Sequence, residues 1–299
     1  MKGSFAPGLL LAIVLALAAT GRGAGELYQD EVLRARADRL AQLTKPDNWL
    51  TLVGLHYLKV GENTVGADRN NDVVLAGGPA RLGMVSVAAN GRLNLTIAPE
   101  ADAQIDGKPL RSAELRPEEM GKPTLVTFGT MSFYALERGG KKALRVKDSA
   151  AKTRTHFLGL DYFPIDPSWR VEAQWVPFEK SRQIPITNML GQATRALAPG
   201  KAVFQREGKT IELLVIDEGP NEPLFIVISD ATSGHETYAA ARFIYTARPK
   251  GDKIILDFNL AENPPCAFTT FSTCPLPPAP NRLPFAVNAG EKKYRGGHE

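Results

Sequence analysis

Hydrophobic residues recur in short alternating runs along most of this chain, from Trp49 onward. Examples are "DVVL", "MVSV" and "RLNL" in the first half, and "IELLVI" and "IILDF" in the second. A period of two between turn residues predicts β-strands. Gly139 and Gly140 stand between two such runs and predict a tight hairpin. Many short strands joined by turns predict a β-sandwich or a barrel.

Two other segments are interpreted from their composition. "GENTVG" and "ADRNND", residues 61–66 and 67–72, are rich in Gly, Asn and Asp, which favour turns. "FAVNAGEKKY", residues 285–294, predicts a last short strand.

A helical pattern precedes the β region. In "LYQDEVLRARADRLAQL", Leu33, Ala37 and Leu40 recur every three or four residues, with most charges on the other sides. Pro46 cannot continue the pattern. We expect a helix within residues 26–48, with those three residues on its apolar side and Leu43 at the margin of that side.

The N-terminus has the layout of a secretory signal peptide. Lys2 precedes an apolar run from about Leu9 to Ala19, which is followed by small residues. A membrane span needs about 20 apolar residues, so the run is short for one, although an uncleaved anchor stays an alternative. We expect a signal peptide over residues 1–21, cleaved after Ala18 or Gly21, and a periplasmic or secreted protein with no other membrane contact.

Composition places the chain among ordinary globular proteins. Its 299 residues are enough for one large or two ordinary domains, and 43% of them are hydrophobic. The formal charge is only +4 and no long basic block occurs, so we expect no nucleic-acid partner. The expected order is a β-sandwich over 49–148, a linker over 149–170 and a second antiparallel β domain, a barrel or meander, over 171–295.

The stretch "NPPCAFTTFSTCPLPPAP" combines prolines with both cysteines of the chain, Cys266 and Cys274. In an oxidising compartment, two nearby cysteines favour a disulfide, here one that closes a small loop. Free or reactive thiols and metal ligation are the alternatives, although redox pairs are usually spaced C-x-x-C. We expect residues 263–284 to form a rigid proline-rich arm that covers a strand edge or a pocket.

This C-terminal run resembles the bacterial DUF1684 family. "NPPCAFTTFSTCPLPPAPNRLPFAVNAGEKKY" carries the resemblance, with "DATSGHETYAAARFIY" and "ILDFN" before it and "WLTLVGL" earlier, so that it extends from about Trp49 to Tyr294. The function of the family is unknown, and the resemblance therefore implies no established activity.

The first β half also resembles forkhead-associated (FHA) domains, which are β-sandwiches that bind phosphothreonine through loops. "NTVGADRNNDVVL", "VSVAANGRLNL" and "IDGKPL" carry this resemblance. The family's arginine and histidine are missing, because Ala67 follows Gly66 and "PARLGMVS" has no histidine. The resemblance implies the fold, and phosphopeptide binding would need Arg69 and Arg81 to meet at one loop tip.

Motifs for known chemistry are missing from the sequence. The four histidines have no metal-ligand spacing, and a zinc site at His235 and Glu236 is a weak alternative. No nucleophile elbow, Walker loop or dinucleotide fingerprint occurs. We expect no cofactor and no metal, and the catalytic residues, if the protein is an enzyme, are unknown.

A polar group in the second half is the candidate site. Arg242 is a charge in an apolar run and needs an acidic partner if it is buried; Asp230, Glu236 and Asp257 are the candidates. The residues expected to line a ligand pocket under the arm, or else to tie the arm down, are Tyr238, Arg242, Asp257, Asn259, Asn263, Asn281 and Arg282.

The leading hypothesis is a non-catalytic exported protein that binds a small ligand or a protein partner. The alternative is a small-molecule hydrolase, or a related enzyme, with its site under the arm at Arg242, Asp257 and Asn259.

Overall fold

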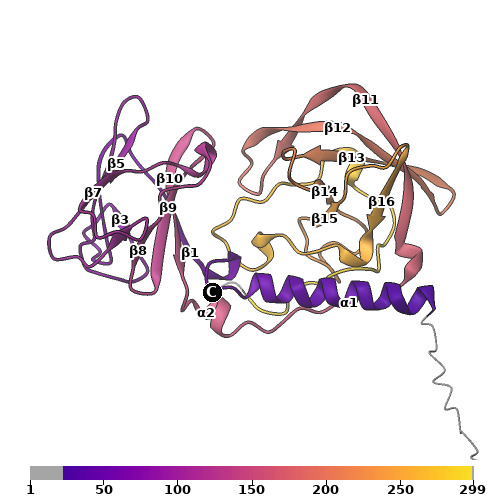
Figure 1. The fold of residues 1–299 in the computed structure, drawn as a ribbon, viewed down its shortest axis with the longest axis horizontal. Helices are drawn as coiled ribbons and strands as arrows, with labels where there is room; N and C mark the ends of the chain where they lie inside the picture. The colour runs from indigo at the N-terminus through magenta and orange to yellow at the C-terminus, as the bar shows by residue number, and fades with distance from the viewer. Residues whose placement is uncertain (1–22, 298–299) are drawn as a thin grey trace, which may run out of the picture.

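The computed structural model describes residues 23–297, which form one long helix and three β-sheets (Figure 1). The protein is mainly β, as predicted. The expected signal peptide lies outside the described residues. Within residues 23–297, no helix is long and apolar enough to cross a membrane.

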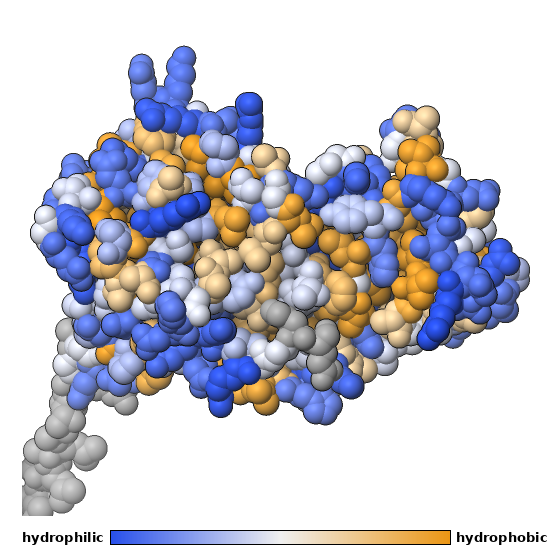
Figure 2. All heavy atoms as spheres, turned by 180° about the vertical axis from the view of Figure 1, so that it is seen from behind, coloured by the Kyte–Doolittle hydropathy of each residue, from blue (hydrophilic) through white to orange (hydrophobic). Residues whose placement is uncertain are grey.

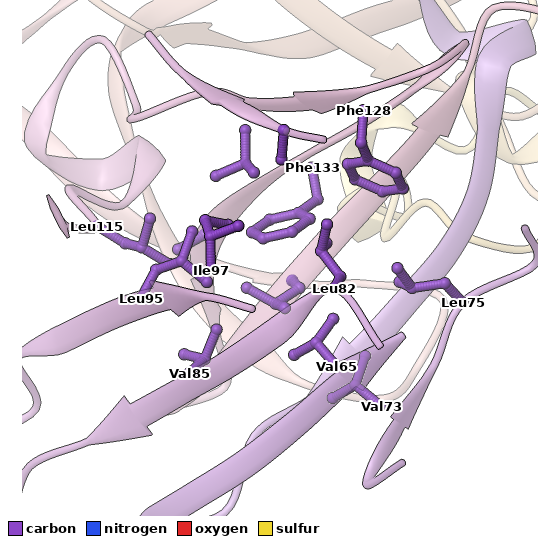
Figure 3. Packing of buried hydrophobic residues seen from close by; sticks show 14 of the residues in the cluster. Val65, Val73, Leu75, Leu82, Val85, Leu95, Ile97, Leu115, Phe128 and Phe133 are labelled. Carbon is purple, nitrogen blue, oxygen red and sulfur yellow. The ribbon is translucent and has the colours of Figure 1, made fainter. Parts of the chain in front are cut away.

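The first half is a sandwich of two five-stranded sheets, with strand orders β1-β10-β9-β8-β6 and β3-β2-β4-β5-β7. The strands are β1 (Leu52–Tyr57), β2 (Gly61–Gly66), β3 (Val73–Val74), β4 (Gly83–Val87), β5 (Leu93–Ile97), β6 (Gln104–Ile105), β7 (Ser112–Glu114), β8 (Val126–Phe128), β9 (Met131–Arg138) and β10 (Lys141–Asp148). Buried side chains from both sheets form its core, among them Val65 and Leu95 from one and Phe128 and Phe133 from the other (Figure 3).

The hairpin predicted at Gly139 and Gly140 joins β9 to β10. Both glycines have positive φ angles, 58° and 74°, which a two-residue turn of the type I′ kind requires. The turn fixes the register of the pair, with Arg138 opposite Lys141. It thereby places Arg138 at the end of the hairpin, where it contacts Thr273 of the second half.

The prediction of a turn at "GENTVG" was wrong, because these residues are strand β2, between β3 and β4. Asn63 in its middle is buried, and its side-chain amide donates to the carbonyl oxygens of Lys59, Gly61 and Val85. A buried, satisfied asparagine is tolerated in a strand, although its type favours turns in isolation.

The segment between the halves packs against the second half. It contains a short helix, α2 (Lys152–Thr155), and a 3₁₀ turn at Pro167–Trp169. Phe163 and Trp169 are buried, and Trp169 packs its ring edge-on against Phe258 at a centroid distance of 5.6 Å.

The second half is a six-stranded sheet of order β15-β14-β13-β12-β11-β16. Its strands are β11 (Arg170–Thr187), β12 (Ala193–Arg206), β13 (Lys209–Asp217), β14 (Leu224–Ile228), β15 (Arg242–Thr246) and β16 (Lys253–Asp257). The sheet curls into a partly closed barrel, in which the Thr246 hydroxyl of β15 donates to the Ile255 carbonyl of β16 over 2.5 Å.

Strand β11 was not predicted as a strand of this length, because it contains Pro177 and Pro185. The register with β12 shifts between Pro177 and Arg182, so the first proline lies at a bulge. Prolines are confined to edges and bulges because they cannot donate to the ladder.

The C-terminal segment forms the proline-rich arm but not the predicted last strand. Leu283, Phe285, Val287 and Ala289 enter the core of the barrel. The Asn281 side chain bonds to the Leu214 carbonyl and amide of β13 and to the Val227 carbonyl of β14, at 2.8–3.0 Å. It replaces ladder hydrogen bonds where these two strands separate.

Helix α1 (Ala24–Leu43) lies along the second β domain (Figure 1). The predicted apolar side was wrong: Leu33 and Leu40 are 49% and 39% exposed, whereas Val32 and Leu43 are buried. The buried side also carries Arg36 and Arg39, which contact backbone carbonyls of the second half. Polar contacts, which a hydrophobicity pattern does not report, decide this orientation.

Candidate functional site

The structure places Arg242, the first residue of β15, against the C-terminal segment. The guanidinium, in a side chain 1% exposed, forms an ion pair with Asp230 at 2.8 Å and donates to the Val287 carbonyl at 2.9 Å and to that of Ala289. Asp230 is one of the partners that the sequence suggested. These bonds fasten the C-terminal segment to the barrel.

Asp257 and Asn259 hold helix α1 and the linker. The Tyr28 hydroxyl lies 2.9 Å from both carboxylate oxygens of Asp257, and the Asn259 amide donates to Tyr28 and to the Asp166 carbonyl. Burial raises the pKa of Asp257 above its usual value. Strand β16 ends at Asp257, and Asn259 lies in the 3₁₀ turn that follows.

The other predicted site residues lie along the arm. The Tyr238 hydroxyl donates to the Cys266 carbonyl at 3.0 Å, the Asn263 side chain donates to the Lys292 carbonyl at 2.8 Å, and Arg282 is exposed. Within the described chain, none of the seven predicted residues lines either of the two cavities discussed below. Ligand binding by these residues stays a prediction.

Cys266 and Cys274 are both free and buried, so the predicted disulfide is not present in this structure. The two residues nevertheless face each other. The backbone N–H of each donates to the sulfur of the other, at 3.1 Å and 3.2 Å.

A cleft lies between the sandwich and the barrel, beneath the arm. It consists of two cavities of about 370 Å³ and about 350 Å³ that share Arg138, Glu218, Phe225, Thr273 and Pro275 in their walls. Figure 2 shows the molecule as two lobes with a notch in the outline between them. A cleft of this size between domains is a usual place for a small ligand.

Three arginines from different elements line the second cavity: Arg39 of α1, Arg138 of β9 and Arg145 of β10. Arg138 forms ion pairs with Glu118 at 3.0 Å and with Glu119 at 2.6 Å, and donates to Thr273 of the arm at 3.3 Å.

Arg145 is the least satisfied of the three. Its side chain is 2% exposed, yet its contacts are a long hydrogen bond of 3.4 Å to the Tyr134 hydroxyl and a distance of 3.8 Å to Glu118. Its Nε has no hydrogen-bond partner among the described residues. The guanidinium also lies 5.8 Å from the centre of the Trp49 ring, which lines the same cavity.

Carboxylates line the other side of this cavity. Glu262 lies 3.1 Å from Arg39, which also binds the buried Glu291 at 3.1 Å. Burial raises the pKa of Glu262 to about 7, although Arg39 opposes the shift. Burial also raises the pKa of Glu291. One arginine thus neutralises two carboxylates that are costly to ionise together.

The apolar part of the wall comes from aromatic rings. Phe225 packs edge-on against Phe243 and stacks on Tyr245, with centroid distances of 4.8 Å and 5.1 Å. Tyr245 remains 43% exposed, so its ring is open to the cleft.

Sequence reasoning missed this cleft, because its residues come from α1, the first sandwich, the barrel and the arm. One signal was available: Arg145 stands between Leu144 and Val146 in a buried strand, as Arg242 stands in its own.

The structure adds little support for the two weaker alternatives from the sequence, which are a zinc site and phosphopeptide binding. No group of three or more potential metal ligands occurs within residues 23–297. The loops of Arg69 and Arg81 adjoin, since the Asp68 N–H donates to the Ala80 carbonyl at 3.0 Å, and both arginine side chains are exposed.

The family comparison agrees with the sequence resemblance. Residues 155–292 match the family model of DUF1684, a protein of unknown function. The chain belongs to the DUF1684 family. The DUF1684 match covers the barrel and the arm but not the first sandwich, whose likeness to FHA domains stays a prediction.

Two solved structures are similar to parts of this chain. An uncharacterized protein of Haloarcula marismortui, solved by solution NMR, is 33% identical over 48% of this chain and 81% of its own, with a TM-score of 0.41. A crystal structure of Rad53 1-466 in complex with AMP-PNP is 10% identical over 75% of this chain and 51% of its own, with a TM-score of 0.18. A search of curated proteins found no match.

Proposed function

We propose that this DUF1684 protein is exported and binds a small organic anion, without catalysis, in the cleft between its two β domains. The pattern of the first 21 residues, which is that of a signal peptide, supports export. The incomplete pairing of the buried Arg145 guanidinium supports the proposals that a ligand binds in the cleft and that this ligand is negatively charged.

Arg145 is a buried cation without a full set of partners. An under-paired buried charge costs several kcal/mol, and proteins satisfy such groups with counter-ions and hydrogen bonds. Glu118 is 3.8 Å away from Arg145 and is itself paired with Arg138 at 3.0 Å. A ligand anion at the cavity wall would supply what this guanidinium lacks.

The rest of the wall defines the ligand class. Guanidinium groups favour the planar oxygens of carboxylate and phosphate. Trp49, Phe225 and Tyr245 offer apolar and aromatic surface beside the arginines. The expected ligand is therefore a small molecule with a carboxylate or phosphate group and an apolar or aromatic body.

Acid–base catalysis at the same cleft is a second candidate function. Glu262 lies on the wall, and its pKa of about 7 suits a general acid or base near neutral pH. The enzyme would then use Glu262 rather than Arg242, Asp257 and Asn259. Turnover of a bound ligand that is lost in Glu262→Gln, with binding retained, would favour catalysis over binding alone.

Binding is tested by thermal shift and calorimetry of the mature chain, with a panel of aromatic and aliphatic carboxylates and phosphate esters. The expected result is saturable binding of at least one compound, lost in Arg145→Gln. Arg92→Gln is the matched control, because Arg92 pairs with Glu114 on the exposed side of the sandwich, outside the cleft. A panel without any binder, or equal affinity in both variants, would reject the proposal.

A further inference from the structure

We propose that Cys266 and Cys274 form a peroxide-reactive thiol pair, in which Cys266 is the attacking sulfur and Cys274 closes a reversible disulfide. The inference does not depend on the proposed ligand. It replaces the permanent structural disulfide expected from the sequence.

The pairing is already built into the arm. Each backbone N–H donates to the opposite sulfur, at 3.1 Å for Cys266 N–H and 3.2 Å for Cys274 N–H. A short 3₁₀ turn, Pro265–Ala267, and the prolines around the pair hold the backbone. Two sulfurs kept together in this way can join without a large movement of the chain.

The two sulfurs have different surroundings. Cys266 Sγ accepts hydrogen bonds from the Ser272 hydroxyl at 3.0 Å and from the Cys274 N–H at 3.2 Å. Hydrogen bonds to a sulfur favour its thiolate, and here the Cys274 thiol and the Ser272 hydroxyl lower the pKa of Cys266 below its usual value. The pKa of Cys274 is raised by its thiol partner and by burial, so Cys274 keeps its proton.

Access favours a small oxidant. Both cysteines are 6% exposed, which excludes attack on a protein disulfide without opening of the arm. Cys274 forms part of the wall of the cleft, together with Ser272 and Thr273, whereas Cys266 does not line it, so hydrogen peroxide from the cleft must pass Cys274 and Ser272 to reach the attacking sulfur.

The reaction balances in two steps. The Cys266 thiolate attacks one oxygen of the peroxide and the O–O bond breaks; the transferred oxygen keeps its hydrogen, which gives the sulfenic acid, and the hydroxide that leaves takes up the proton that Cys266 lost. Cys274 then attacks the Cys266 sulfur, the S–O bond breaks, and the hydroxide that leaves takes up the Cys274 proton as water. Two thiols are oxidised and one peroxide is reduced, and a thiol reductant returns the pair to its starting state.

The first experiment is peroxide titration of the reduced mature chain, followed by intact and peptide mass spectrometry. The chain has only these two cysteines, so every thiol signal belongs to them. We expect loss of two hydrogen atoms in the peptide that contains both residues, and full recovery with dithiothreitol. An unchanged mass, or a disulfide that dithiothreitol does not reduce in the folded protein, would overturn the proposal.

The assignment of roles is tested with two matched variants and dimedone, which traps sulfenic acids. Cys274→Ser should accumulate trapped sulfenic acid on Cys266, because its resolving thiol is gone. Cys266→Ser should be trapped more slowly, because the Ser272 hydroxyl lies 3.0 Å from Cys266 Sγ but 3.7 Å from Cys274 Sγ and so favours the Cys274 thiolate less. Equal trapping in the two variants would contradict the assignment.

If either variant fails to fold, the wild-type protein still tests which of the two cysteines is the attacking one. Iodoacetamide alkylation of the folded, reduced protein, resolved by peptide mass, should label Cys266 before Cys274. Labelling in the opposite order would contradict the roles.

Discussion

Arg242 and Asp230 form a buried ion pair with an N–O distance of 2.8 Å and side chains that are 1% and 0% exposed. Arg242 also donates to the carbonyls of Val287 and Ala289, and Asp230 accepts from the Val287 N–H at 3.1 Å. The pair therefore holds together the start of β15, the loop after β14 and the C-terminal segment. The geometry of this ion pair is that of a structural contact between chain segments rather than that of a ligand-binding site.

Arg242→Met is expected to destabilise the protein by about 3–5 kcal/mol, because it leaves Asp230 buried without its cation. Urea unfolding followed by circular dichroism measures the change. Arg248→Met is the matched control, since Arg248 pairs with Asp217 in a solvent-exposed site. A loss in Arg242→Met no greater than in the control would contradict the structural role.

Substitution of Arg145 should affect stability in the opposite way to substitution of Arg242. Arg145→Met removes a buried charge whose nearest carboxylate contact, Glu118, keeps Arg138 as a partner. Replacement of a poorly compensated buried charge by an apolar side chain is often neutral or stabilising, here by up to about 1 kcal/mol. The measurement is the same urea titration of the ligand-free chain, and a loss as large as that of Arg242→Met would show that Arg145 has a structural role.

Glu262 is expected to make stability depend on pH. Its pKa rises from 4.5 to about 7 on folding, chiefly because it is buried. The folded state therefore keeps a proton that the unfolded chain loses, and the contribution present below pH 4.5 is lost as the pH rises to 7. The wild type should lose stability across this window.

The check is the melting temperature of Glu262→Gln and wild type from pH 4 to 8. The variant should show the flatter profile and should gain on the wild type toward pH 8. Glu100→Gln, at an exposed position, is the control and should follow the wild type. Glu291 adds a slope of the same sign to all three proteins, so only the difference between profiles tests Glu262. Parallel profiles for Glu262→Gln and wild type would contradict the assignment.

Much of the fold followed from local patterns. The strands around Leu95 and Leu256 were predicted because their side chains alternate between a buried face and an exposed one. Local pattern failed where tertiary contacts outweigh it. Asn63 lies in a strand because its amide is satisfied by three carbonyls, and β11 continues past Pro177 because a bulge accommodates the proline.

The site was less accessible to sequence reasoning than the fold. The search for charges in apolar strands found Arg242, which forms a close ion pair with Asp230 at 2.8 Å, and passed over Arg145, whose nearest carboxylate is 3.8 Å away. The two are alike in sequence, and only the position of an acidic partner separates them. Asp230 lies 12 residues from Arg242, whereas the cavity beside Arg145 is assembled from residues that lie from Arg39 to Pro275 along the chain.

Helix α1 gives the last test, because the sequence and the structure disagree about which of its sides matters. Arg39→Ala removes the ion pairs with Glu262 and Glu291 and the bond to the Asn263 carbonyl, and leaves Glu291 buried and unpaired. We expect a loss of about 3–5 kcal/mol in the urea titration. Leu33→Ala is the matched change on the side predicted to be apolar, and since Leu33 is 49% exposed its effect should lie within about 0.5 kcal/mol. A larger loss for Leu33→Ala than for Arg39→Ala would mean that the helix docks through its apolar side after all.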